Sequence, residues 1–381
     1  MARPIPEAPP VMTATRPCKR PATSAPPWAP PLGAPGGSAG PPDGGPRVTA
    51  RTICAVATTM LPAPAALPDV LPTGRLSETG RPFPEVRASL REVDDARNAL
   101  SVAWAWGQAA LVVTVAVRLD HPLAWAAAFV LMGRQFALLS ILAHEAAHRL
   151  LFRSKRANDV LGRWLLAGPA FVPLDGYRRG HMAHHRDELG PNEPDLNLYV
   201  GYPVTRASLR RKLTRDAFFV SGWKSLKGLL RALTSAFARP VALRILAAQL
   251  GVLALFAAAG RPELYLVLWL GPWLTVWRVL NRLRAIAEHG GMTRSPDRRL
   301  STHHVRQTPW ARFWITPYNT GWHLAHHVDI GIPWRNLPAL HEELAASGWV
   351  TPALTHRSYV ALWRTLASRP DVAAAAPRPV S

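Results

Sequence analysis

Residues 122–148 read PLAWAAAFVLMGRQFALLSILAHEAAH. Up to residue 143 the stretch is almost entirely apolar. Its length approaches the ~20 residues that a helix needs to cross the hydrocarbon core of a membrane. His144 and His148 follow directly, and positions four apart lie on one face of a helix. The stretch predicts a membrane-spanning helix that ends in two imidazoles on the same face.

Three further stretches are apolar over a similar length, at 101–117, about 241–259 and 263–280. One such stretch alone is also compatible with a buried helix of a soluble protein. The links at 118–122 and 260–263 are very short, so the four stretches form two close pairs. We therefore expect an all-α integral membrane fold with four transmembrane helices in two hairpins.

Basic residues dominate the charged part of the sequence. Lys and Arg number 45 against 24 for Asp and Glu, a net charge of +21. They concentrate at 149–240 and after residue 280, and cytoplasmic loops carry such an excess. We expect both termini and a helical cap to be cytoplasmic, in a bacterial-type inner membrane. Arg134 and Arg278, within or near spans, are expected to snorkel toward the interface.

The same charge distribution argues against nucleic acid as the partner. The basic residues alternate with long apolar runs and form no single stripe. Anionic lipid head groups or an acidic electron carrier are the expected partners of the basic surface.

The two ends of the chain differ from its middle. Residues 1–83 are rich in Pro, Ala and Gly, a composition typical of disorder, and both cysteines lie there. Met60 is an alternative initiation site within this extension. We expect one membrane domain at 84–368 and a disordered tail at 369–381.

Histidines gather in three short motifs, HEAAH at 144–148, HMAHH at 181–185 and HLAHH at 323–327. A lone histidine pair is usually a surface feature, but three motifs on one predicted membrane face indicate metal binding, because neutral imidazole binds iron and zinc. His289, just after the fourth apolar stretch, is a further candidate. The predicted ligands are His144, His148, His181, His184, His185, His289, His323, His326 and His327. A tetrahedral zinc site takes four ligands, so this number predicts two metal ions.

Other side chains are expected to orient these ligands, because metal-bound histidines usually donate their second N–H to a carboxylate. The candidates flank the motifs and are Asp187, Glu193, Asp195, Glu288 and Asp329. The alternative for each of these residues is a solvated loop carboxylate with no role at the site. His121, His303, His304, His341 and His356 are not expected to bind metal.

The three motifs, the paired apolar stretches and the segment PYNTGWHLAHHVDIGIPWRNLPALHEEL at 317–344 resemble the membrane fatty acid desaturase family. The resemblance covers roughly 100–345. It implies a non-haem di-iron centre held by the nine histidines, O2 as co-substrate and an external electron donor such as ferredoxin. Asn319 matches the family's Asn and would orient a ligand or a water. THHV at 302–305 departs from the Thr-Arg-Thr-Val of many relatives.

The function expected from this resemblance is O2-dependent desaturation of a fatty acyl chain carried by a lipid, CoA or a carrier protein. Hydrogen removal from an unactivated methylene is beyond any side-chain base, so the metal cofactor must supply the oxidising power. A hydroxylase of an alkane, a carotenoid or a lipid is the alternative, since the same centre can yield an alcohol.

HEAAH also matches the zinc protease motif HExxH, in which Glu145 would be the general base. Asp175 in PLDG would then be a third ligand of an intramembrane zinc metalloprotease. This alternative leaves the other seven histidines unexplained. A ferritin-like site would need a second Glu-x-x-His pair, which the chain lacks.

Overall fold

The computed structural model describes residues 60–370, and this part of the chain is mainly helical. Disorder is predicted for residues 1–83 and 369–381, and of these ranges residues 1–59 and 371–381 lie outside the described part of the chain. Within that range two short strands, β1 (His304–Val305) and β2 (Thr355–His356), pair in parallel.

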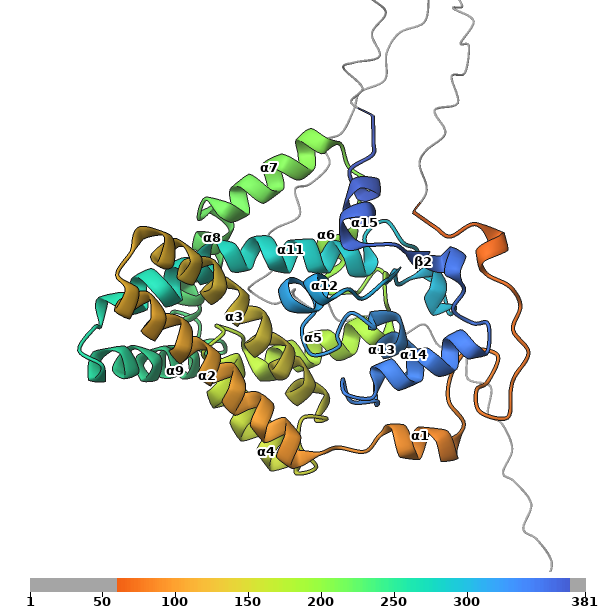
Figure 1. Cartoon of the computed structure of the whole chain (residues 1–381), viewed down its shortest axis with the longest axis horizontal. Helices are drawn as coiled ribbons and strands as arrows, with labels where there is room; N and C mark the ends of the chain where they lie inside the picture. The colour runs from red at the N-terminus through yellow and green to blue at the C-terminus, as the bar shows by residue number, and fades with distance from the viewer. Residues whose placement is uncertain (1–59, 371–381) are drawn as a thin grey trace, which may run out of the picture. The chain divides into compact units, whose positions relative to one another are not determined.

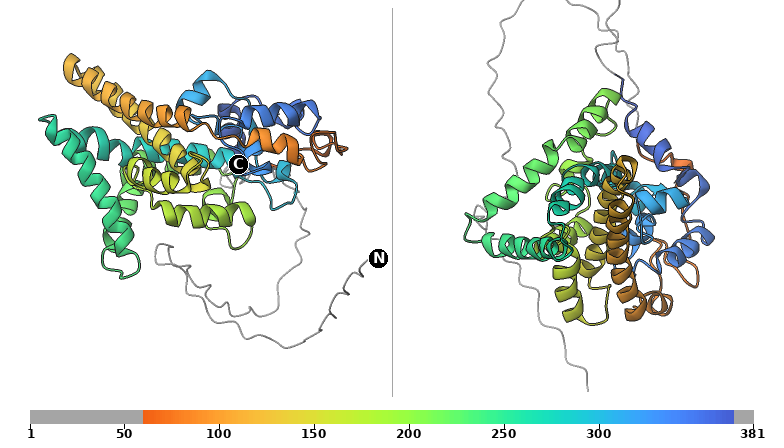
Figure 2. Two further views of the ribbon diagram at one scale, coloured as in Figure 1. Left: turned by 90° about the horizontal axis from the view of Figure 1, so that it is seen from below. Right: turned by 60° about the vertical axis from the view of Figure 1, so that its left-hand side comes forward.

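Three helices of residues 60–370 are long and apolar enough to cross a membrane: α2 (Asp95–Leu119), α3 (Pro122–His148) and α9 (Arg239–Ala258). The side chain of Asp94 caps α2, and α3 begins with proline, whose missing N–H costs nothing in a first turn. Asp120, in the left-handed conformation, ends α2. The two helices form the predicted hairpin and extend away from the C-terminal helices (Figures 1 and 2).

The fourth apolar stretch does not form one continuous helix. A π-helical segment η3 (Tyr265–Leu270) leads into α10 (Gly271–Leu274), and α11 (Val276–His289) begins beyond Thr275. Pro272 accounts for the π-helical segment before it, because proline lacks an N–H and its ring clashes with the preceding turn. The Thr275 hydroxyl donates to the carbonyl of Gly271, at 2.8 Å. A fourth membrane crossing stays a prediction.

Shorter helices complete the described part of the chain. They are η1 (Pro64–Ala66), α1 (Pro84–Leu90), α4 (Lys155–Leu161), η2 (Gly162–Ala167), α5 (Leu174–Arg186), α6 (Leu196–Tyr199), α7 (Arg206–Ala217), α8 (Val220–Ala232), η4 (Arg298–Leu300), α12 (Pro309–Trp314), α13 (His323–Val328), α14 (Leu337–Ala346), η5 (Pro352–Leu354) and α15 (Tyr359–Leu366).

Arg134 lies in the middle of α3 and is 8% exposed, so it does not snorkel to an interface. Its guanidinium donates to the side-chain oxygen of Gln108 on α2, at 3.1 Å, and to the carbonyl of Phe313, at 2.7 Å. It also lies 4.0 Å over the Phe313 ring. Protein partners therefore satisfy this charge, and they join α3 to α12.

Residues 60–83 pack against the domain, although the sequence places them in the expected extension. Leu76 is 2% exposed and lies in one apolar cluster with Leu344 and Trp349. Arg75 forms an ion pair with Glu343, at 2.7 Å. The Pro-rich composition does not reveal these few side chains, which anchor the segment to the domain.

Candidate metal centre

Four helices bring the predicted ligands together. The C-terminal end of α3 carries His144 and His148, and His289 is the last residue of α11. The HMAHH motif lies in the last turns of α5, and HLAHH opens α13. Because each motif is helical, its histidines share a face, and the ends of α3, α5, α11 and α13 meet in one region (Figure 1).

The nine imidazoles form two neighbouring groups, which are joined by a third set of nitrogens within 4.8 Å of one another, from His184, His185 and His327. In the first, each of five histidines offers a nitrogen within 4.8 Å of the others: His144, His148, His181, His185 and His326. The second contains His289, His323 and His327 at the same spacing. His184 joins this second group, since its ring centroid lies 4.9 Å from that of His289 and 5.0 Å from that of His327.

The Nε2 atoms within each group face one another. The Nε2–Nε2 distance is 2.9 Å for His181 and His185 and 3.1 Å for His185 and His326. In the second group, Nε2 of His323 lies 3.0 Å from that of His289 and 3.1 Å from that of His327. Nε2 of His148 is buried without a hydrogen-bond partner. Lone pairs that converge in this way fit a bound cation.

Burial keeps most of these imidazoles neutral, as metal binding requires. It lowers the pKa of His181, His185, His323 and His326 well below the ordinary value. Burial also lowers the pKa of His327, to about 3.

Glu188 is the residue that the sequence analysis missed. It is 3% exposed, and its carboxylate lies 2.9 Å from Nδ1 of His327 and 3.0 Å from Nδ1 of His289. Arg298 and the Thr302 hydroxyl also donate to it. Burial raises the pKa of Glu188, but the two histidines outweigh burial and hold this pKa well below its usual range.

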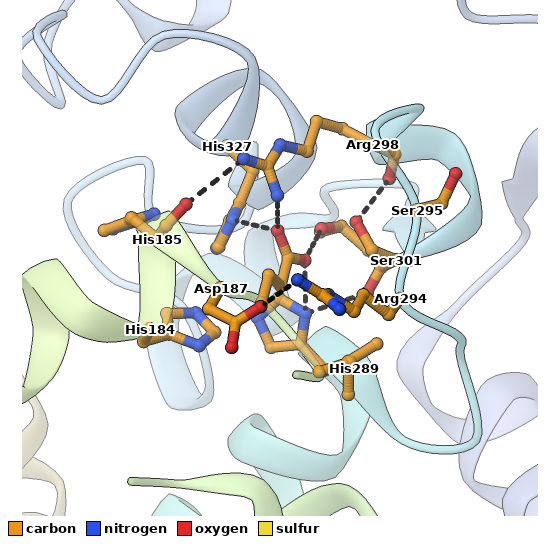
Figure 3. A network of polar contacts seen from close by, with 12 residues as sticks. His184, His185, Asp187, His289, Arg294, Ser295, Arg298, Ser301 and His327 are labelled. Carbon is orange, nitrogen blue, oxygen red and sulfur yellow. Dashed lines mark hydrogen bonds and ion pairs between the residues drawn. The ribbon is translucent and has the colours of Figure 1, made fainter. Parts of the chain in front are cut away.

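These contacts set the tautomers of the second group. An N–H at Nδ1 of His327 or His289, directed at Glu188, leaves Nε2 of the same ring as the metal-binding atom. Figure 3 shows His327 beside Arg298, and His289 near Ser301. The Ser301 carbonyl lies 2.9 Å from Nδ1 of His289 and supports the same orientation.

Glu193 and Glu288, two of the predicted carboxylates, also lie at the cluster. Oε1 of Glu193 is 2.6 Å from Nδ1 of His184. Oε1 of Glu288 is 3.7 Å from Nδ1 of His323 and accepts a hydrogen bond from Arg284, at 2.9 Å.

Asp195 is placed differently. It lines a small cavity beside the histidines, and burial raises its pKa.

The remaining three candidates have arginine partners. Asp187 pairs with Arg294, at 2.7 Å (Figure 3). Asp329 pairs with Arg87. The side-chain oxygen of Asn319 accepts from Arg312, at 3.1 Å. The structure gives these three side chains no contact with a histidine of the cluster. Their closeness in sequence to a histidine motif therefore does not place them beside a ligand.

The histidines that were not expected to bind metal lie outside both groups. His303 contacts the carbonyl of Gly290 through Nε2, at 2.9 Å. His304 stacks on His341, with 4.6 Å between ring centroids. Burial lowers the pKa of both His303 and His304 to about 3.

The contacts of Asp175 count against the protease alternative. Asp175 pairs with Arg163 at 3.0 Å. Glu145 lies 3.2 Å from Nδ1 of His144 and accepts from the backbone N–H of Trp334, at 3.3 Å. Asp175 is thus engaged away from the imidazoles, as a third zinc ligand would not be.

Two cavities adjoin the histidines. The smaller, of about 160 Å³, is lined by histidines of both groups. The larger measures about 290 Å³ and is lined largely by α3, α8 and α11. The two cavities share the lining residues His144, Tyr177, Asn281 and Arg284, so the larger cavity adjoins the first group at His144.

Four helices that bring together nine buried or half-buried imidazoles define a helical protein with a histidine-rich site suited to metal ions. The chain belongs to the fatty acid desaturase family, whose model matches residues 120–360.

The chain is also similar to proteins that are each named as desaturases. The chain is 28% identical over 223 residues to the dihydrorhizobitoxine desaturase of Bradyrhizobium elkanii, which covers 54% of this chain and 63% of that protein. It is 30% identical over 100 residues to the sn-1 acyl-lipid omega-3 desaturase (ferredoxin) of Nostoc, 26% of each chain. It is also 30% identical over 92 residues to the Delta(12) fatty acid desaturase of Mortierella isabellina. This match covers 23% of this chain and 22% of that protein.

The chain thus spans less than two thirds of the length of each of these relatives.

Proposed function

We propose that this protein is an O2-dependent oxidoreductase that desaturates an acyl chain at a histidine-held di-iron centre, with electrons from an external donor. The observation that carries the proposal is the convergence of nine imidazoles, six of them buried and three half-buried, in two groups in which four Nε2–Nε2 distances are 2.9–3.1 Å. Family membership supports the reaction class.

The donor set divides between two ions. His144, His148, His181, His185 and His326 would hold one iron, and His184, His289, His323 and His327 the other. Imidazole nitrogen is a suitable ligand for iron. When bound, the metals supply the oxidising power that removes hydrogen from a methylene carbon.

The chain's own residues prepare this site. Glu188 and Glu193 fix the tautomers of His289, His327 and His184, so that the Nε2 atoms stay unprotonated and aimed inward. Six of the nine histidines are buried, which limits the access of bulk water to the site.

The membrane arrangement is part of the proposal. Four crossings in two hairpins, with the stretch at 263–280 as the fourth, would place the histidines at the cytoplasmic face of a bacterial-type inner membrane. The apolar lengths of α2, α3 and α9 and the basic residues of 149–240 support it. An acyl-lipid, acyl-CoA or acyl-carrier-protein substrate and a ferredoxin-like donor are the proposed partners, and one relative's name includes ferredoxin.

The experiment is gas chromatography–mass spectrometry of acyl chains from a bacterial host that expresses a ferredoxin system. Wild type is compared with His184→Ala and with His121→Asn. His121 is exposed and caps α3, a role that Asn also fills, so this variant is the matched control.

New unsaturated chains are expected with wild type and His121→Asn and not with His184→Ala. Hydroxylated chains in place of unsaturated ones would mean that the enzyme is a hydroxylase and not a desaturase. Equal product from His184→Ala would contradict the ligand assignment.

A further inference from the structure

The larger cavity beside His144 has an unusual lining. The described residues that form it include two arginines, Arg278 and Arg284, and no carboxylate. Both arginines come from α11, and Ser140 of α3 lines the same cavity. The rest of the wall is largely apolar, with Phe171 stacked on Trp273 at 4.0 Å between ring centroids.

Three polar atoms of this lining have no hydrogen-bond partner. They are Oγ of Ser140, Nη2 of Arg278 and Nε of Arg284, and all three are buried. A buried donor without a partner destabilises the folded chain, so three around one cavity point to a ligand that completes them.

Arg278 is held in place by its surroundings and does not snorkel. Its Nε donates to the carbonyl of Trp273, at 3.1 Å, and its guanidinium lies 4.0 Å over the Trp273 ring. Within residues 60–370 it forms no ion pair with a carboxylate. The positive charge is therefore fixed in place while Nη2 stays free to donate.

Arg284 is prepared in a similar way. Its Nη1 donates to Glu288, which leaves Nε as a second donor at the cavity. Guanidinium groups pair with carboxylates and phosphates through short, charge-assisted hydrogen bonds. Glu288 engages only Nη1 of Arg284 and does not line this cavity, so two guanidinium groups and a hydroxyl remain to match an anion there.

We infer that this cavity binds the compact anionic head group, a carboxylate or a phosphate, of the substrate. The inference rests on the proposed function and narrows its substrate class to acids or phosphate esters that carry the anion close to the oxidised bond. His144 lines the same cavity, so a bound head group lies next to the first histidine group. At about 290 Å³ the cavity is at the small end of ligand sites, which favours a head group with a short chain.

The test is calorimetric titration of the full chain in a non-ionic detergent with three probes of equal chain length: hexanoate, hexyl phosphate and hexanol. The variants are Arg278→Gln, Arg284→Gln and Ser140→Ala. Arg231→Gln is the control, because Arg231 is exposed at the end of α8.

Wild type and the control are expected to bind at least one anionic probe, at least about tenfold more tightly than hexanol. Each arginine variant should lose about tenfold or more of this affinity, as expected for a charge-assisted hydrogen bond. Tight binding of hexanoate alone identifies a free acid as the substrate, and tight binding of hexyl phosphate alone identifies a phosphate head group. Ser140→Ala, which removes a single oxygen, should weaken anion binding several-fold. This variant tests the anion site if an arginine variant does not fold.

Equal affinity for hexanol and both anions would overturn the inference, as would affinities unchanged within twofold in all folded variants. Iron content measured on the same samples separates the two proposals. Anion binding by a chain that takes up no iron would refute the di-iron centre and leave the anion site standing.

Discussion

Nδ1 of His327 lies 2.9 Å from Oε2 of Glu188, a carboxylate that is almost completely buried. The same carboxylate lies 3.0 Å from Nδ1 of His289. One side chain thus orients two imidazoles that come from α13 and α11, helices far apart in the sequence. This shared contact makes Glu188 the positioning residue on which the second group depends most.

Glu188→Gln should therefore reduce iron binding about 10- to 100-fold, the usual cost of losing a partner of a metal ligand. The amide keeps the shape of the side chain but loses the charge that orients both N–H groups. Iron bound per chain, titrated with a competing chelator, measures the effect. Asp187→Asn is the matched control, because its carboxylate pairs with Arg294 and should keep wild-type iron. Equal iron affinity in Glu188→Gln and wild type would refute the role.

Glu145→Gln should retain its iron and activity within about tenfold of wild type, because a mechanism based on the metals gives Glu145 no proton to transfer. Glu145 contacts the backbone N–H of Trp334, and the amide oxygen of Gln can accept the same hydrogen bond. Turnover and metal content are measured on one preparation. Complete loss of activity with intact metal would favour the protease alternative.

Asp159→Asn should lower the melting temperature at pH 7. Asp159 joins Arg149 after α3 to Arg178 on α5, at 2.9 Å to Arg149. Burial raises the pKa of Asp159, but hydrogen bonds from both arginines outweigh burial and leave this pKa lower than usual. The stabilisation is therefore fully present above the unfolded pKa of about 4 and disappears as pH falls through the lower folded value.

The melting temperatures of wild type and Asp159→Asn should thus converge as the pH falls from 4 toward 2. Glu342→Gln, at an exposed carboxylate, should follow wild type throughout. A difference between wild type and Asp159→Asn that is independent of pH would rule out the charge as the cause.

Arg134→Leu should destabilise the domain by about 1–3 kcal/mol, because it leaves the carbonyl of Phe313 and the amide oxygen of Gln108 without their donor. The midpoint of thermal unfolding in detergent measures the effect. Arg118→Leu at the exposed end of α2 is the control and should change the midpoint little. Equal midpoints for the two variants would mean that the buried contacts of Arg134 contribute nothing.

The family and the candidate ligands were predictable from the sequence because both depend on local spacing. HxxxH and HxxHH place imidazoles on one helical face whatever the rest of the chain does. The same holds for α2, α3 and α9, whose apolar length is a local property. The match over residues 120–360 confirms the family.

Contacts made outside regular helices were not predictable in the same way. Glu188 lies two residues beyond the end of α5, where helical spacing no longer says which carboxylate turns toward the site. Asp187, its neighbour, turns to Arg294 instead. Pro272 and Thr275 break the fourth apolar stretch, although its composition suits a continuous span.

Burial of an arginine is also a tertiary property. The sequence predicts snorkelling for Arg278, because it does not show that Trp273 lies under the guanidinium. A charge near the end of a span thus has two fates, and only the packing of neighbouring helices decides between them.

Elemental analysis of the purified full chain tests the central claim most directly. Two irons per chain are predicted for wild type, with a clear loss of iron in His184→Ala and in His326→Ala, one variant for each histidine group. One zinc per chain, or iron that is unaffected by both substitutions, would contradict the di-iron centre.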